Sequence, residues 1–304
     1  MIYFQVPKPD APSGGVWFLY KCVDLLNRAG KPARALQREN EYIAWWDACP
    51  IDKSLIVTEA RLHDSDVLVV PEGNWPPVQT SGRHIMFVQN YIWLPKGIDL
   101  AREKPETIVC SQFLKNHMRR VYGIEAPIIT PYLEEKVWAP TPKQKNRTLV
   151  MARRTEYAPM VRDALELEGF PVEYVDASLT QRQLAEKLAD CEFYMHLVSP
   201  EGWPMACVEA QRMGTIVCGT TGGGGLEFMF NRETAMVVQS PEEGRYSPQQ
   251  FIDNLMSAMW ELRGRPGGEE AAADLRSRMW QAAYNWSLQY NAEATTKQLL
   301  KVFG

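Results

Sequence analysis

Residues 199–229 read SPEGWPMACVEAQRMGTIVCGTTGGGGLEFM, and this stretch decides how the rest of the chain is interpreted. Its first two acidic residues are Glu201 and Glu209, with seven residues between them. The prolines and glycine around Glu201 indicate a loop. Glu209 falls in the following segment, where apolar residues recur at helical spacing, so we expect that segment to be a helix.

The expected helix has recognisable ends and one apolar face. Pro204 suits its first turn, and Gly214 suits a left-handed residue just past its end. Ala206, Ala210 and Met213 form the apolar face. Glu209 lies next to this face, which is an unusual place for a carboxylate without partners.

A strand and a glycine-rich loop follow the helix. Residues 215–218 read as a buried strand, and residues 222–225 are four consecutive glycines. Glycines let a ligand approach the backbone closely, so we predict that the N–H groups of Gly223 and Gly224 face a diphosphate. Loop, acid, helix with a second acid, strand and glycine loop together outline a nucleotide-sugar site.

This stretch resembles the C-terminal signature of the GT-B glycosyltransferases, specifically the large retaining family 4. In the first half of the chain, the run FVQNY at residues 87–91 resembles the bacterial rhamnosyltransferase-like subset of that family. The signature reads roughly E-G-F-G-x-P-x-x-E-A-x-A-x-G-x-P-V-V-x-S-x-x-G-G-x-x-E. The matching residues are Glu201, Gly202, Pro204, Glu209, Ala210, Gly214, Gly223, Gly224 and Glu227. Trp203 stands where the signature has Phe, and Thr215–Ile216 replaces its small-residue–Pro pair.

The resemblance implies an α/β fold of two Rossmann-like, doubly wound domains that face a cleft. It implies a metal-independent transfer, with retention, of a sugar from a nucleoside-diphosphate sugar to an acceptor. That donor is a substrate, so no cofactor is expected. Glu201 would hold sugar hydroxyls, and Glu209 would hold the ribose. The neighbouring donor contacts would come from Gly202, Trp203, Pro204 and Met205.

An alternative reading gives both acids ordinary structural roles. Glu209 could pair with Arg212, three residues further along the same helix face. Glu201 could merely cap the helix. The glycines and the spacing favour the functional reading over this one.

Composition is typical of a globular enzyme and limits the classes of partner. The chain has 304 residues, a formal net charge of −4 and six scattered cysteines. The charge argues against broad capture of nucleic acid. No apolar run reaches the length of about 20 residues that spans a bilayer, and residues 1–10 lack signal-peptide features. We therefore expect a cytoplasmic protein with free thiols.

The first half of the chain opens as a doubly wound domain. Residues 2–6 predict a strand, and a helix over residues 16–27 follows Gly14 and Gly15, which would let a ligand approach the helix N-terminus. Residues 66–70 and 85–88 predict two further strands. The Asp-x-Asp at residues 64–66 precedes its strand, so a turn is expected there and not a metal site.

Gln89 and Asn90 follow the strand at residues 85–88, where many family members have a histidine near the reacting carbon. An amide is no general base at neutral pH, but it can hydrogen-bond a sugar or a phosphate. We predict that Gln89 and Asn90 join Glu201 as the catalytic residues.

The second domain opens with a strand over residues 148–152, followed by Arg153 and Arg154. Ligands bind beyond the carboxyl ends of such strands, and a guanidinium suits a phosphate. The family has Gly-Arg here and a lysine soon after; this chain has Ala152 and no such lysine, so Arg154 or Arg162 could take its place. Two solvated arginines are the structural alternative.

The domains are expected to span residues 1–140 and 141–284, with the linker at 139–146 and a C-terminal helix, within 285–304, that packs back on the first domain. His196 ends the strand before the signature and is expected to be a hydrogen-bonded core histidine. Two other functions remain open. One is a GT-B protein that binds a nucleotide or a partner without catalysis, and the other is a sugar-nucleotide epimerase.

Overall fold

The computed structural model of the protein describes residues 1–8, 13–37, 51–77, 81–140, 147–152, 155–244 and 246–304. The chain divides into two compact units. The N-terminal unit comprises Met1–Glu134 together with Tyr290–Gly304, and the C-terminal unit comprises Glu135–Gln289.

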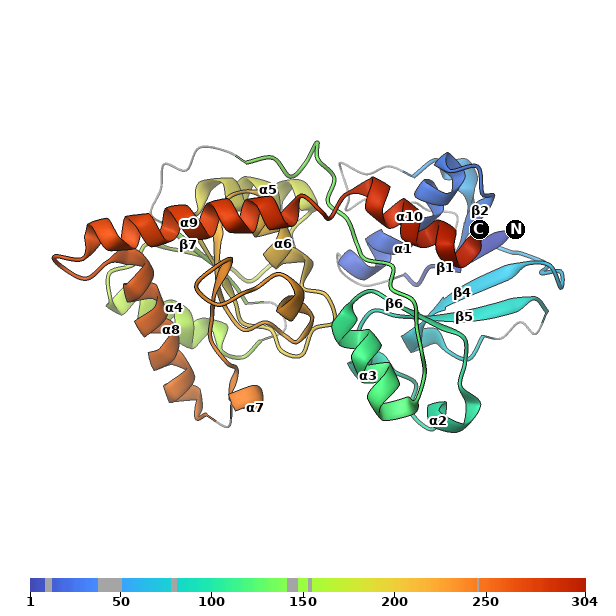
Figure 1. Ribbon diagram of the computed structural model, residues 1–304, viewed down its shortest axis with the longest axis horizontal. Coiled ribbons are helices and arrows are strands. Elements are labelled where there is room, and N and C mark those ends of the chain that lie inside the picture. Colours follow the sequence, from blue (N-terminus) through green and yellow to red (C-terminus); the bar gives the residue numbers. More distant parts are fainter. Residues whose placement is uncertain (9–12, 38–50, 78–80, 141–146, 153–154, 245) are drawn as a thin grey trace. The chain divides into compact units, whose positions relative to one another are not determined.

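The N-terminal unit is built on one sheet whose strands run parallel in the order β3-β2-β1-β4-β5-β6 (Figure 1). This is the doubly wound order, in which the direction of winding reverses between β1 and β4. The strands are β1 Ile2–Gln5, β2 Ala33–Leu36, β3 Ile56–Val57, β4 Val67–Pro71, β5 Arg83–Val88 and β6 Thr107–Val109.

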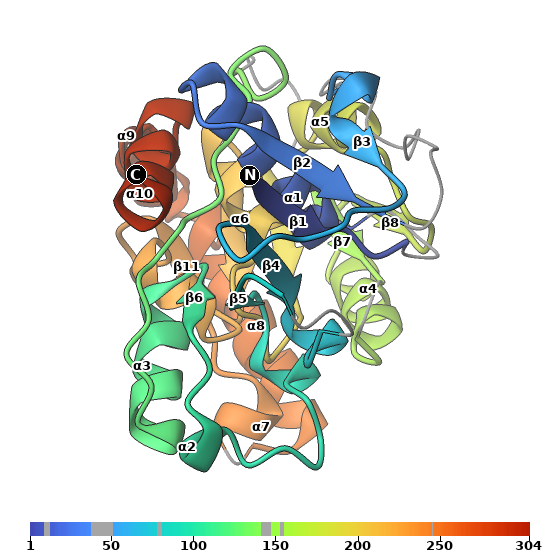
Figure 2. The same ribbon diagram turned by 90° about the vertical axis from the view of Figure 1, so that its right-hand side faces the viewer.

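Two helices of this unit begin at serine caps. The Ser13 hydroxyl accepts a hydrogen bond at the start of α1, and Ser111 does the same for α3. Figure 2 looks onto the strands β2, β1 and β4 of this unit. The helical elements are α1 Gly14–Arg28, α2 Leu100–Glu103, α3 Gln112–Tyr122, α10 Ala292–Phe303, η1 Lys53–Leu55, η2 Glu72–Asn74 and η3 Tyr91–Trp93.

The last helix, α10, packs on the N-terminal unit. It contacts α1, and the Phe303 ring lies 5.9 Å from the Phe4 ring of β1. The Gln298 amide oxygen accepts a hydrogen bond from the backbone N–H of Thr130 at 2.7 Å. Residues distant in sequence therefore share one core.

The sequence reading of this unit was incomplete. The apolar residues 128–129 form only a single bridge, between Val109 and Ile128. Strands β2 and β3 were not predicted, because they are short and carry no alternating apolar pattern that separates them from loops. The turn expected at residues 64–66 is confirmed, since the backbone N–H of Asp66 donates to the His63 carbonyl oxygen.

The C-terminal unit has a second parallel sheet in the order β11-β10-β9-β7-β8. Its winding reverses between β7 and β9, its first and third strands. The strands are β7 Thr148–Met151, β8 Val172–Val175, β9 Phe193–His196, β10 Ile216–Gly219 and β11 Ala235–Val237. The helical elements are α4 Ala158–Leu167, α5 Gln181–Asp190, α6 Met205–Arg212, α7 Pro241–Gly244, α8 Pro248–Arg263, α9 Glu269–Ser287 and η4 Gly224–Glu227.

Local sequence signals explain the helix boundaries of this unit. Thr180 and Ser247 begin α5 and α8 with complete capping boxes. Gly214 lies just past α6 with φ of 76°, a conformation that favours glycine. The linker expected at residues 139–146 falls largely outside the described residues.

The described helices include none that is both long and apolar enough to cross a membrane. Five of the six cysteines lie in the described part of the chain, and all five are buried thiols that form no disulfide there.

Candidate functional site

The candidate site of the C-terminal unit begins at the carboxyl end of β9, one of the two strands that flank the reversal of winding. Ligands of open α/β sheets bind outside the carboxyl ends of strands at such a point. The chain leaves β9 at His196 and reaches Glu201 within one loop. The other flanking strand, β7, leads to Arg153 and Arg154, which lie outside the described residues.

The loop that carries Glu201 is fixed by the glycine loop. The backbone N–H of Glu201 donates to the Gly222 carbonyl oxygen at 2.7 Å, and the N–H of Gly224 donates back to the Glu201 carbonyl oxygen at 2.9 Å. A side chain at position 224 would collide with the carbonyl group of Gly202. Only glycine therefore allows the two loops to approach this closely.

The N–H groups of the glycine loop are largely engaged within the protein. Those of Gly223 and Gly225 donate to the side-chain and backbone oxygens of Thr221, at 3.2 and 2.8 Å. Residues 222–225 are also buried. This arrangement differs from the expectation that Gly223 and Gly224 offer their N–H groups to a diphosphate; in this structure they support the Glu201 loop.

The start of α6 provides backbone donors instead. Among the described residues, none accepts a hydrogen bond from the N–H groups of Met205 or Ala206, and both residues are only half-buried. Such free N–H groups carry the positive end of the helix dipole. Gly202, Trp203 and Pro204 before them are buried, and the Trp203 ring lies 4.9 Å from the Phe228 ring.

Glu209 is a buried carboxyl group on α6 with only 4% of its surface exposed. Burial raises its pKa to about 8, and no hydrogen bond or charge from the described residues counteracts this effect. A buried carboxyl group without donors is energetically unfavourable, and such groups concentrate where a ligand binds.

The alternative pairing of Glu209 with Arg212 is wrong. The Arg212 guanidinium is also buried, but it turns to the end of α9, where its Nε donates to the Ser287 hydroxyl at 2.9 Å and an Nη donates to the Ser287 carbonyl oxygen at 2.5 Å. The carboxyl group of Glu209 is therefore left for another partner.

His196 lies beside Glu201, at the end of β9. Its Nε2 is 3.8 Å from the nearer carboxylate oxygen of Glu201, which is half-buried. Neither imidazole nitrogen has a hydrogen-bond partner in the described part of the chain, so the expectation of a hydrogen-bonded core histidine is wrong. Burial lowers the pKa of His196 to about 4, which leaves the ring neutral at neutral pH.

Tyr194 is a site residue that the sequence reasoning missed. It lies two positions before His196 on β9, on the same face of the strand, and their rings are 6.2 Å apart. Burial raises the pKa of its hydroxyl, and the nearby Cys207, Glu201 and Glu209 raise it further. The alternation of Tyr194 and His196 was the available signal. Both acids thus lie around one tyrosine.

Arg162, the suggested replacement for the missing lysine, has other contacts. Its guanidinium pairs with Asp163 at 2.6 Å and lies 4.8 Å from the centre of the Tyr174 ring. It lies on α4, with 35% of its side chain exposed.

The N-terminal unit brings Gly14, Gly15, Gln89 and Asn90 together at the carboxyl edge of its sheet. A side chain at position 15 would collide with the Gln89 amide, so glycine leaves room for that amide beside the start of α1. Within the described residues, the N–H groups of Gly14 and Gly15 have no acceptor. The Asn90 amide oxygen accepts a hydrogen bond from the N–H of Ile92 at 3.2 Å.

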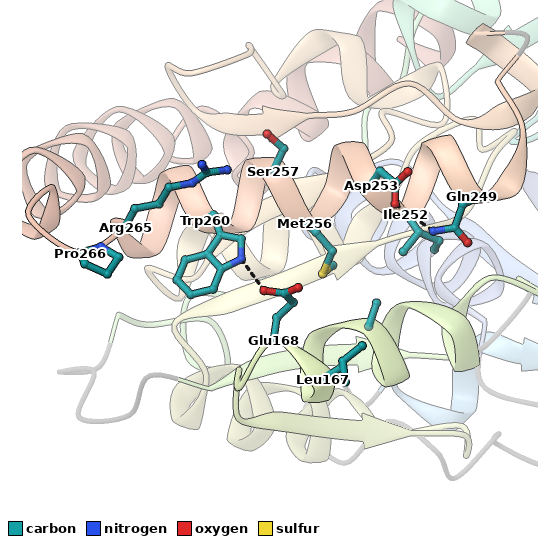
Figure 3. Close-up of a pocket in the computed structure, with 11 residues that line it drawn as sticks. Leu167, Glu168, Gln249, Ile252, Asp253, Met256, Ser257, Trp260, Arg265 and Pro266 are labelled. Carbon is teal, nitrogen blue, oxygen red and sulfur yellow. Dashed lines mark hydrogen bonds between the residues drawn. The ribbon is translucent and has the colours of Figure 1, made fainter.

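No group of three or more His, Cys, Asp or Glu side chains suited to a metal ion occurs among the described residues. A separate surface hollow lies between α4 and α8, where the Trp260 indole donates to Glu168 at 3.0 Å (Figure 3). Neither Glu201 nor Glu209 lines this hollow.

The fold belongs to the class in which two Rossmann-like units form one chain, as in GT-B glycosyltransferases. No protein-family profile matches the sequence, and neither does any curated protein. Solved structures of low sequence identity do match, and their likeness shows the fold.

Three solved structures illustrate this likeness. Sucrose-phosphate synthase from Thermosynechococcus elongatus has a TM-score of 0.68 at 13% identity, with 99% of this chain and 98% of that chain covered. A glycosyltransferase from Rickettsia africae has the same TM-score and identity, with 99% and 97% covered. HepE from Anabaena, in complex with UDP and glucose, has a TM-score of 0.63 at 11% identity, with 99% of each chain covered. The predicted α/β fold class with two Rossmann-like domains is confirmed.

Proposed function

We propose that the chain is a glycosyltransferase that moves a sugar from a nucleoside-diphosphate sugar to an acceptor, with retention of configuration and without a metal ion. The observation that carries this proposal is Glu209, a buried carboxyl group without a protein donor, on the helix that follows the Glu201 loop. The two hydroxyls of a ribose are donors of the kind that such a carboxyl group lacks.

The remaining donor contacts follow from the geometry of the same unit. Glu201, half-buried at the carboxyl end of β9, would accept hydrogen bonds from sugar hydroxyls. The free N–H groups of Met205 and Ala206 at the start of α6 would stabilise the negative charge that develops on the leaving diphosphate. Arg153 and Arg154 follow β7 in sequence and would supply cationic contacts to the same phosphates.

Gln89 and Asn90 would act on the acceptor side, from the N-terminal unit. Because an amide cannot remove a proton at neutral pH, they would orient groups in the transition state. In a retaining transfer the leaving phosphate itself would then accept the proton of the acceptor hydroxyl. In this proposal the C-terminal unit binds the donor, and residues of the N-terminal unit orient the reacting groups.

The decisive experiment measures release of nucleoside diphosphate from a panel of nucleotide sugars without acceptor. UDP-glucose is the first probe, since HepE was determined with UDP and glucose. We expect slow release that survives excess chelator and is lost in Glu201→Ala and Glu209→Gln. Glu168→Gln, in the hollow of Figure 3, is the matched control and should behave as wild type.

The other outcomes separate the alternatives. Tight binding of a nucleotide sugar without turnover, across a broad set of acceptors, would identify a non-catalytic binding protein. Conversion of the donor to an epimer without release of diphosphate would identify an epimerase. A requirement for Mn²⁺ or Mg²⁺ would contradict the metal-independent site.

A further inference from the structure

The N-terminal unit contains a buried glutamate, Glu72, at the carboxyl edge of its sheet. Glu72 is the residue that follows β4, and β4 flanks the reversal of winding in this sheet. Only 5% of its surface is exposed. It therefore lies at the carboxyl edge of the sheet, where ligands of such folds bind, but beneath the surface.

The Glu72 carboxyl group faces the backbone of the loop after β5. The N–H of Asn90 donates to its Oε1 at 2.8 Å. Burial raises the pKa of Glu72 to about 7, while the nearby backbone N–H groups, that of Asn90 foremost, act in the opposite direction. The side chain thus holds the peptide N–H of Asn90, the residue after Gln89.

This hydrogen bond holds the backbone directly after Gln89. The N–H of Asn90 is bound by Glu72, and the Gln89 amide lies against Gly15 at the start of α1. The side chain is only half-buried, so a moving backbone would carry the amide away from this position. The Asn90 amide oxygen is in turn occupied by the N–H of Ile92.

We propose that Glu72 is a positioning residue, whose carboxyl group fixes the Gln89–Asn90 backbone and thereby holds the Gln89 amide where sugar transfer requires it. This inference rests on the proposed function. Glu72 itself is buried beneath the loop and would act through Gln89 without touching substrate.

Asp66 provides a matched control at the opposite end of the same strand. It precedes β4, is 6% exposed, and accepts the backbone N–H of His63 at 2.9 Å. Like Glu72 it is a buried carboxyl group that accepts a backbone N–H, and it also pairs with the N-terminal ammonium of Met1 at 2.9 Å, but it lies at the amino edge of the sheet, away from the predicted catalytic loop. A purely structural role for Glu72 would make the two acids equivalent.

The test compares Glu72→Met, Glu72→Gln and Asp66→Asn in steady-state hydrolysis of UDP-glucose, or of the nucleotide sugar that the panel identifies. We expect Glu72→Met to lower kcat about a hundredfold with KM nearly unchanged, because misplaced groups lose orientation and not affinity. Glu72→Gln keeps one oxygen acceptor and should lose less. Asp66→Asn should keep the wild-type kcat.

A double variant shows whether Glu72 acts through Gln89. If it does, adding Glu72→Met to Gln89→Ala should lower kcat no further than Gln89→Ala alone. Fully additive losses would overturn the proposal, and so would equal kcat values for Glu72→Met and Asp66→Asn.

Amide hydrogen exchange tests the positioning role of Glu72 without relying on the proposed activity. If wild type hydrolyses no nucleotide sugar, the proposed function fails, but positioning is still measurable. The amide of Asn90 should exchange at least about tenfold faster in Glu72→Met, less so in Glu72→Gln, and no faster in Asp66→Asn. Unchanged exchange in both Glu72 variants would overturn the positioning role, whatever the activity.

Discussion

Each unit of this protein contains one buried glutamate near the carboxyl edge of its sheet, and the two differ in their partners. Glu72 accepts a hydrogen bond from the backbone N–H of Asn90, whereas Glu209 accepts none from the described residues. Burial raises the pKa of both, to about 7 and about 8. A buried carboxyl group that has a donor from its own protein stabilises the local backbone, whereas one without a donor is suited to bind a ligand that supplies it.

The largest expected effect is a difference in stability between two equivalent substitutions. At about pH 5, Glu72→Met should lower the free energy of unfolding by about 1–3 kcal/mol, because it leaves the buried N–H of Asn90 without an acceptor. Glu209→Met leaves no donor unpaired and should change it by less than about 1 kcal/mol. Denaturant titrations of both variants measure this difference. Equal decreases in the free energy of unfolding would contradict the claim that the two glutamates differ in their hydrogen-bond partners.

The stability comparison also has a predicted pH dependence. The pKa of Glu209 is raised in the folded state, so its contribution to stability is present below the unfolded pKa of about 4.5 and is lost as the pH rises through about 8. Glu209→Met should therefore become stabilising with rising pH, by about 2–4 kcal/mol at pH 8. Glu168→Met is the control, and a gain independent of pH would contradict the assignment.

The next effect concerns binding of the nucleotide. Glu209→Gln should weaken UDP binding about ten- to a hundredfold, because a charged hydrogen bond is worth about 1.5–3 kcal/mol. Calorimetry with UDP measures it, and Glu72→Gln should leave the UDP affinity unchanged. Loss of UDP affinity in Glu72→Gln as large as in Glu209→Gln would show that both acids serve the donor.

A smaller effect is the pH dependence of donor affinity. Glu209 is protonated at neutral pH in the free protein, and it must lose its proton to accept hydrogen bonds with both oxygens. Affinity for UDP-glucose should therefore rise about tenfold between about pH 6.5 and 8.5. The rise should disappear in Glu209→Gln; if it persists there, another group is responsible.

The smallest effect concerns Arg212, the alternative partner of Glu209. Arg212 donates to Ser287 at the end of α9, so Arg212→Lys should leave the UDP affinity within about twofold of wild type. Its unfolding midpoint should fall. A decrease in UDP affinity comparable to that of Glu209→Gln would instead link the guanidinium to the site.

Much of the fold was predictable because its signals are local. Ser13, Ser111, Thr180 and Ser247 each cap a helix, and the apolar run before Glu72, which predicted a strand, forms the central strand β4. These features depend on hydrogen bonds within one turn or on unbroken apolar sequence. The short strands β2 and β3 were missed because only their neighbours in the sheet make them strands.

The sequence by itself determined which acids could form a donor site, since Glu201, Glu209 and the glycines at 222–225 lie close together in one stretch. Only the tertiary structure decided which hydrogen-bond partners these groups have. It directs Arg212 to α9 and leaves Glu209 without a donor, and it engages the N–H groups of Gly223 and Gly224 within the protein. It also places Glu72 against the backbone of Asn90, because residues 18 apart become neighbours only when β4 and β5 pair.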